Sequence, residues 1–129
     1  MTVAVMEREV KNRIDMAEID AFAAELLTTP KGKALSEKHL EQIREDDDIA
    51  TVASVISIIY DRGSSKNGPL SYFLMLYELT KYVREKCQEI LDEKERINLL
   101  EYAEEGEEEL QYIVKSKSER ESILSQAYQ

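Results

Sequence analysis

The chain has 129 residues with 27 acidic and 17 basic side chains, and its net charge of −10 argues against direct binding to DNA, RNA or an anionic membrane. Hydrophobic residues make up 43% of it, which excludes a disordered chain, and four glycines with two prolines are too few turn residues for an all-β fold. We therefore predict an all-α fold, in which residues 1–129 form a single domain: a bundle of about five helices.

Residues 1–14 are ambiguous between a short strand and a helix. The first firm helix is predicted over residues 16–28, with Asp15 as its N-cap, because its apolar residues recur at helical spacing. We expect Pro30 and Gly32 to end it. Its apolar face consists of Ile19, Phe22, Ala23, Leu26 and Leu27.

Two shorter helices are predicted next. Ser36 is the candidate N-cap of a helix over residues 37–45, and Asp48 can cap another over residues 49–60. The second of these is rich in β-branched residues, so a strand is an alternative. We favour the helix because of its acidic cap, its length and the lack of a partner strand.

A loop over residues 61–69 divides the chain into two halves, since it holds two glycines, a proline and several polar residues. The periodic segment that follows, residues 70–102, predicts one long central helix. At 1.5 Å per residue it would be about 50 Å long. A compact domain of this size is only about 36 Å across. An unbroken helix would therefore overhang the domain, so either it kinks or its end packs on something else. The second alternative predicts self-association, as a homo-oligomer or as a subunit of a complex.

Residues 101–109 hold six glutamates and no base. Like charges four residues apart destabilise a helix, and Gly106 adds to this cost. We therefore expect a break near Gly106 and a last helix after it. The C-terminal residues 118–129 are a candidate for fraying.

The location is predicted from the cysteine count and the hydropathy. Cys87 is the only cysteine, so no disulfide can form within the chain and a reducing compartment is favoured. The first ten residues lack the apolar core of a signal peptide. The most apolar stretch, residues 70–79, is too short to span a bilayer. We expect a cytoplasmic protein without membrane contact.

Catalytic groupings are not evident in the sequence. His39 is the only histidine and Cys87 the only thiol, and no nucleophile motif surrounds either residue. We interpret them as an exposed helical histidine and a half-buried structural cysteine. Zinc sites built from cysteine and histidine are excluded by count. The sequence thus predicts no catalytic residue, no cofactor and no enzyme.

A carboxylate site for a divalent metal is an alternative, because carboxylates on facing helices can hold Mg²⁺. The spacing E-x-x-D at residues 89–92 and E-E-x-x-E at residues 104–108 resembles, in reversed order, the acidic motifs of all-α nucleotide pyrophosphatases, although Gly106 interrupts the second. That resemblance implies a metal-dependent nucleotide hydrolase, but it does not assign the chain to the family. The residues concerned are Glu85, Glu89, Asp92 and Glu104.

Two groups of residues are candidates for contact with a protein partner. The first is apolar and aromatic, the composition that interfaces favour, and consists of Tyr72, Phe73, Met75, Leu76 and Tyr77. The second is acidic and could attract a basic partner, and consists of Glu101, Glu104, Glu105 and Glu108.

These features favour a non-enzymatic interaction or regulatory protein, or a small helical subunit of a larger complex. The charge supports a second hypothesis, an acidic inhibitor that mimics nucleic acid and blocks a host enzyme. The third hypothesis is the metal-dependent hydrolase. The first two predict a protein partner, possibly basic in charge, and no direct contact with nucleic acid.

Overall fold

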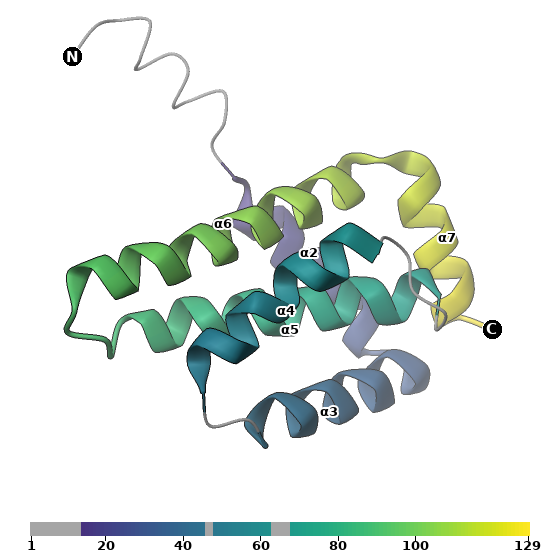
Figure 1. Ribbon diagram of the computed structural model, residues 1–129. Coiled ribbons are helices and arrows are strands. Elements are labelled where there is room, and N and C mark those ends of the chain that lie inside the picture. The colour runs from purple at the N-terminus through teal and green to yellow at the C-terminus, as the bar shows by residue number, and fades with distance from the viewer. Residues whose placement is uncertain (1–13, 46–47, 63–67) are drawn as a thin grey trace, which may run out of the picture.

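The structure is a computed structural model, and it describes residues 14–45, 48–62 and 68–129, without the side chains of Ser57 and residues 59–62. These residues form six α-helices and no strand (Figure 1): α2 (Met16–Leu27), α3 (Pro30–Arg44), α4 (Ile49–Arg62), α5 (Pro69–Cys87), α6 (Glu93–Lys115) and α7 (Lys117–Ala127). The all-α prediction is confirmed over this part of the chain, with six helices where about five were expected. Residues 1–13, for which strand and helix were left open, lie outside it.

Helix α5 lies at the centre of the bundle. Helices α3, α4, α6 and α7 pack against it. Helix α2 reaches it through an edge-to-face contact of Phe22 with Phe73, whose ring centroids are 5.2 Å apart. Because neighbours surround it, almost every position in its first three turns is buried. This explains why the sequence of residues 70–79 is apolar on nearly every side.

Two of the predicted helix starts are confirmed by their caps. The Asp15 carboxylate accepts a hydrogen bond from the Glu18 N–H at 3.2 Å, and α2 begins at the next residue. The Asp48 carboxylate accepts from the Ala50 N–H at 3.1 Å, and α4 follows. The segment that could have been a strand is therefore a helix. It extends through Arg62, two residues into the predicted loop, whose residues 63–67 lie outside the described part.

The start of α3 differs from the prediction. Pro30 occupies the first turn of this helix and does not only terminate the preceding one, and Thr29 is the cap, accepting from the Gly32 N–H at 3.0 Å. Proline suits a first turn because its missing N–H would have no helical partner there. Ser36, the predicted cap, lies instead in the middle of α3 and is buried.

The predicted long helix over residues 70–102 is two helices. Helix α5 ends at Cys87, and after a turn over residues 88–92 the Asp92 carboxylate caps α6 by accepting from the Glu95 N–H at 2.8 Å. The 19 residues of α5 and the 23 of α6 give lengths of about 28 and 34 Å. Neither exceeds the width of the domain, so the overhang that predicted self-association does not exist. Self-association itself stays a prediction.

The break expected near Gly106 is also absent, because α6 runs through this residue to Lys115. Gly106 is buried, and a Cβ atom there would collide with the Thr80 Cγ2 of α5 and would lie 3.3 Å from the Ile56 Cγ2 of α4. The glycine therefore allows three helices to approach closely. Its packing offsets the helix propensity that it lacks.

Helix α7 closes the bundle at the start of α5. The Gln126 side chain accepts from the Leu70 N–H at 2.8 Å, and it lies against Gly68, where a Cβ would be 2.6 Å from the amide nitrogen. Gly68 has a φ of 91°, which favours glycine. The stretch considered a candidate for fraying, residues 118–129, thus contains a helix whose Ile123 and Ala127 are buried.

Candidate interaction surface

The predicted apolar contact residues lie mainly in the core. The rings of Phe73 and Tyr77 are stacked with centroids 6.3 Å apart, and α2 covers both. Contact between this group and a partner would require a covering helix to move away. Tyr72, Phe73, Leu76 and Tyr77 are buried, and Met75 is partly exposed.

Tyr77 illustrates how the core accommodates a polar group. Its hydroxyl donates a hydrogen bond to the Asp20 carboxylate of α2 at 2.8 Å. Burial and this bond raise the pKa of Tyr77 above its ordinary value. The phenol therefore stays neutral and joins α2 to α5.

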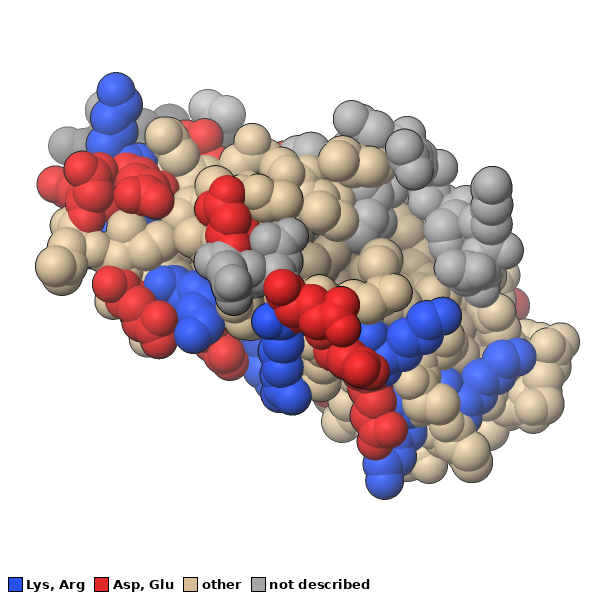
Figure 2. Space-filling model, turned by 60° about the horizontal axis from the view of Figure 1, so that its bottom comes forward, with Lys and Arg blue, Asp and Glu red and all other residues tan. Residues whose placement is uncertain are grey.

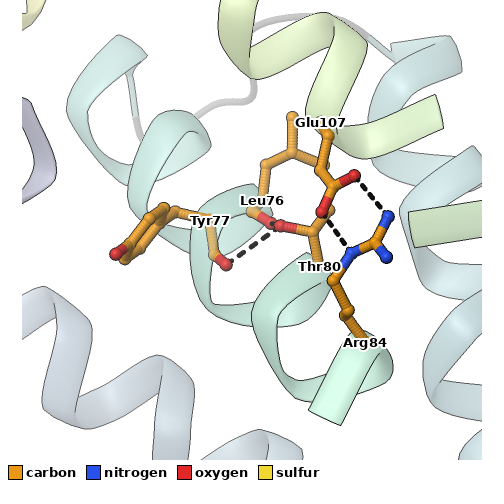
Figure 3. Close-up of polar contacts among 5 residues, drawn as sticks. All are labelled: Leu76, Tyr77, Thr80, Arg84 and Glu107. Atoms are coloured by element: carbon orange, nitrogen blue, oxygen red, sulfur yellow. Dashed lines mark hydrogen bonds and ion pairs between the residues drawn. The ribbon is translucent and has the colours of Figure 1, made fainter. Parts of the chain in front are cut away.

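The contact between α5 and α6 contains a paired charge next to Gly106. Figure 3 shows Arg84 of α5 and Glu107 of α6 pointing toward each other. The Arg84 Nε lies 2.6 Å from one Glu107 carboxylate oxygen and its Nη2 lies 2.7 Å from the other. The Glu107 side chain is only 6% exposed. These hydrogen bonds raise the pKa of Arg84, and they satisfy both carboxylate oxygens.

Glu107 therefore belongs to the fold, although in the sequence it is one of six glutamates within residues 101–109. A signal for its position is present in the sequence. Glu107 follows Ala103 by four residues and precedes Leu110 by three, so it lies on the buried face of α6. One turn before Arg84, the Thr80 hydroxyl donates to the carbonyl oxygens of Leu76 and Tyr77 and presents its methyl group to Gly106 (Figure 3).

The predicted acidic residues line the opposite face of α6. We call this face the outer stripe, and it consists of Ile97, Glu101, Glu104, Glu105, Glu108 and Tyr112. Glu101, Glu104 and Glu108 are exposed, and Glu105 is partly buried. At the two ends of the stripe, Ile97 is 48% and Tyr112 is 65% exposed. They are 15 residues apart, about 22 Å along the helix axis.

The outer face of α3 has a different charge pattern. Figure 2 brings the α3 side of the molecule forward and shows blue and red side chains interspersed. The outer stripe of α6 carries no base between Ile97 and Tyr112. The single sign of its charge is thus a local feature and not only a result of the composition. The exposed charged residues of α3 are Lys31, Lys33, Glu37, Lys38, Glu41 and Arg44.

Helix α5 turns into α6 at one end of the bundle (Figure 1). Apolar side chains are exposed there. Leu91 in this turn is 97% exposed. A shallow hollow begins beside it and reaches Ile97 and Asn98 on the first turns of α6. This feature was not expected, because residues 88–92 were predicted to continue a helix.

The two residues considered for catalysis are buried more deeply than expected. His39 is 4% exposed and not an exposed helical residue, and its Nε2 lies 3.3 Å from the Ser71 Oγ. Cys87 is 1% exposed, and burial raises the pKa of its thiol. A Ser–His pair can activate a nucleophile. Ser71 is only 3% exposed, however, so no substrate reaches this pair in the folded chain.

Two of the four carboxylates considered for a metal have other contacts. Asp92 caps α6, and Glu89 lies 3.5 Å from the Lys86 ammonium. Within the part of the chain that the structure describes, no group of three or more histidine, cysteine, aspartate or glutamate residues could hold a metal ion.

None of the described helices is long and apolar enough to cross a membrane.

Comparison of the chain with protein-family models, with curated proteins and with solved structures finds no match. The function must therefore be inferred from the side chains on the surface of the molecule.

Proposed function

We propose that the chain is a non-enzymatic interaction or regulatory protein, or a small helical subunit of a larger complex, that binds a basic protein partner through the outer stripe of α6. The observation that carries the proposal is the composition of this stripe. Exposed glutamates lie between an exposed isoleucine and an exposed tyrosine on the longest helix. The single cysteine, which cannot form a disulfide within the chain, supports a cytoplasmic location for this partnership.

The charge of the stripe indicates the kind of partner. None of the ion pairs among the described residues involves Glu101, Glu104 or Glu108. These carboxylates therefore contribute little to the fold through charge pairing. Lysine or arginine side chains of a partner would be steered toward them and would pair with them on contact.

The apolar ends of the stripe supply binding energy that charge alone would not. Tyrosine is enriched among the residues that dominate interface energetics. Ile97 lies in the hollow next to the α5–α6 turn, where Leu91 is also exposed. A basic partner with two apolar side chains about 22 Å apart, such as an amphipathic helix, would engage both ends at once.

The experiment is a pull-down of the tagged full chain from the lysate of its native host, with nuclease present, at low and at high salt. A variant that removes three charges, E101Q/E104Q/E108Q, tests the glutamates, and I97S/Y112S tests the apolar ends. The matched control is E37Q/E41Q/E45Q, which removes three exposed charges from α3 and its C-cap. We expect both α6 variants to lose a stoichiometric partner that the control retains.

Two results would contradict the proposal. One is a monodisperse monomer that captures no protein under any of these conditions. The other is a partner that the control variant loses as completely as the α6 variants, since the α6 stripe would then have no special role.

The acidic inhibitor that mimics nucleic acid is the second candidate. The regular spacing of exposed carboxylates along one helix favours it, because a row of negative charges resembles the phosphate backbone that a nucleic-acid-binding protein recognises. It predicts a partner that binds nucleic acid and that is released steeply as salt rises. Retention at high salt, with loss only in I97S/Y112S, would exclude it and leave the interaction protein.

A further inference from the structure

Helices α3 and α5 meet through a layer of buried polar side chains. The Ser36 hydroxyl donates a hydrogen bond to the Glu78 carboxylate at 3.0 Å. One turn along α3 from Ser36, His39 contacts Ser71. Each of these four residues is at most 8% exposed. Polar groups in such a layer stabilise the contact only while each has a partner.

His39 is the member of this layer that lacks a complete set of partners. Its Nε2 faces Ser71, but its Nδ1 is buried and has no hydrogen-bond partner among the described residues. A neutral imidazole can leave one nitrogen as an unused acceptor at moderate cost. A protonated imidazole has two N–H donors and a positive charge, and both require a partner or water.

The groups around the ring do not compensate a positive charge. Burial is the largest cause that lowers the pKa of His39, and Lys38 next to it in the sequence acts in the same direction. Gln42 and Ser71 act in the opposite direction through hydrogen bonding, but both side chains are neutral and cannot compensate the charge. On α5 the nearest carboxylate in the layer, Glu78, lies seven residues beyond Ser71 and is bonded to Ser36.

The other helices packed against α3 are α2 and α7. No charged group of α2 or α7 is among the described groups that shift the pKa of His39. His39 is thus a buried base with a lysine beside it, and no acid among the described side chains faces it.

We infer that α3 is an acid-labile cover of α5: protonation of His39 loosens α3 and uncovers the apolar face of α5 that this helix protects. Helical spacing places Leu74 and Met75 between Ser71 and Glu78 on that face. Met75 belongs to the group of apolar residues that the sequence predicts as a protein interface. The inference concerns this second surface and does not depend on the binding function proposed for α6.

The direction of the pH effect follows from linkage. A histidine whose pKa is lower in the folded chain binds a proton more readily once α3 has opened. The closed state is therefore fully favoured above the ordinary histidine pKa of about 6.5, and it loses stability as the pH falls below that value.

The opening should be confined to α3. On the other side of α5, the charge of Glu107 is paired at 2.6 and 2.7 Å with Arg84, and neither member is a histidine. Helices α5 and α6 should therefore stay together at a pH at which α3 is loosened.

Two measurements on the full chain test the inference. Because His39 is the only histidine, its imidazole resonances in an NMR titration report on this site without overlap. Hydrogen exchange followed by mass spectrometry, corrected for the intrinsic effect of pH, then compares α3 with α6 between pH 7.5 and 5.5. We expect a pKa below the ordinary value and amide exchange in α3 that becomes several-fold faster at pH 5.5, while α6 is unchanged.

Variants separate His39 from other groups that titrate at low pH. H39Q keeps a donor for Ser71 but cannot be protonated, so its α3 should exchange equally at both pH values. E109Q is the control, because burial raises the pKa of the Glu109 carboxyl and that group also titrates above its usual range. We expect E109Q to behave like the unmodified chain.

If H39Q does not fold, the measurements on the unmodified chain still test the inference. An imidazole with an ordinary or raised pKa, or exchange in α3 that is insensitive to pH while His39 titrates, would overturn the inference. Acceleration of α3 and α6 together would also overturn it, since it would indicate global unfolding.

Discussion

Buried polar groups are paired differently in the contact of α5 with α6 and in the contact of α5 with α3. On the α6 side, a charged pair is joined by two short hydrogen bonds, and the packing beside it is close enough to require Gly106. On the α3 side, single hydrogen bonds of 3.0 and 3.3 Å join neutral or half-satisfied groups. The first arrangement should be rigid and the second easier to open, because an incompletely satisfied polar layer stabilises less than close packing.

The largest effect should come from G106A. A methyl group at this position collides with Thr80 Cγ2, and overpacking of a core costs about 1–3 kcal/mol. We expect about 2–3 kcal/mol less free energy of unfolding in a urea titration, although alanine is the better helix former. In the double variant G106A/T80S the serine lacks the colliding methyl group but keeps the hydroxyl. Stability that does not recover in the double variant would contradict this explanation.

The next largest effect should come from R84M. It leaves the Glu107 carboxylate buried without its partner, which costs 3–5 kcal/mol in fully buried pairs. The Arg84 side chain is 43% exposed and water can partly replace it, so we expect about 2 kcal/mol at pH 7. E107Q should cost less, because it leaves no unpaired buried charge. Equal losses in the two variants, measured by denaturant unfolding, would show that the charge of Glu107 does not matter.

A smaller effect is expected on the α3 side. S36A removes the hydroxyl that donates to Glu78, and a net hydrogen bond contributes about 1 kcal/mol. Ser122 on α7 is exposed, and S122A is the matched control that should change the free energy of unfolding little. A cost of S36A above that of R84M would reverse the proposed order of the two contacts.

The sequence predicted those parts of the fold that depend on near neighbours. Asp15 and Asp48 cap helices within three residues of themselves, so the starts of α2 and α4 were correctly expected. The turn over residues 88–92 contains no glycine or proline and was missed. The sequence feature that indicates this turn is the N-cap of α6, since Asp92 and Glu95 have the spacing of a capping box.

The predictions that were wrong concern features that depend on contacts between residues far apart in the chain. Gly106 looked like a helix break, but its role is set by Thr80 and Ile56 on two other helices. His39 was expected to be exposed, but it is buried against Ser71 of α5, 32 residues away in the chain. The acidic positions of α6 were predicted to be a surface, and the structure places Glu101, Glu104 and Glu108 together on the outer stripe; their partner stays a prediction.

The smallest expected effect separates the outer faces of α3 and α6. Glu108 has Glu104 and Glu105 within one turn and no base at three or four residues. Glu41 on α3 also has like charges four residues away, Glu37 and Glu45, but Lys38 and Arg44 three residues away offset them. Like charges one turn apart destabilise a helix by a few tenths of a kcal/mol. E108Q should therefore raise the free energy of unfolding by about 0.3 kcal/mol, and E41Q should not raise it.

The difference should shrink as salt screens the exposed charges. It is measurable by parallel urea titrations at low and high ionic strength. Loss of stability in E108Q would mean that this glutamate serves the fold. A gain in stability combined with weaker capture of the partner would mean that α6 retains repelling charges that its own fold does not need, which is the behaviour expected of a binding surface.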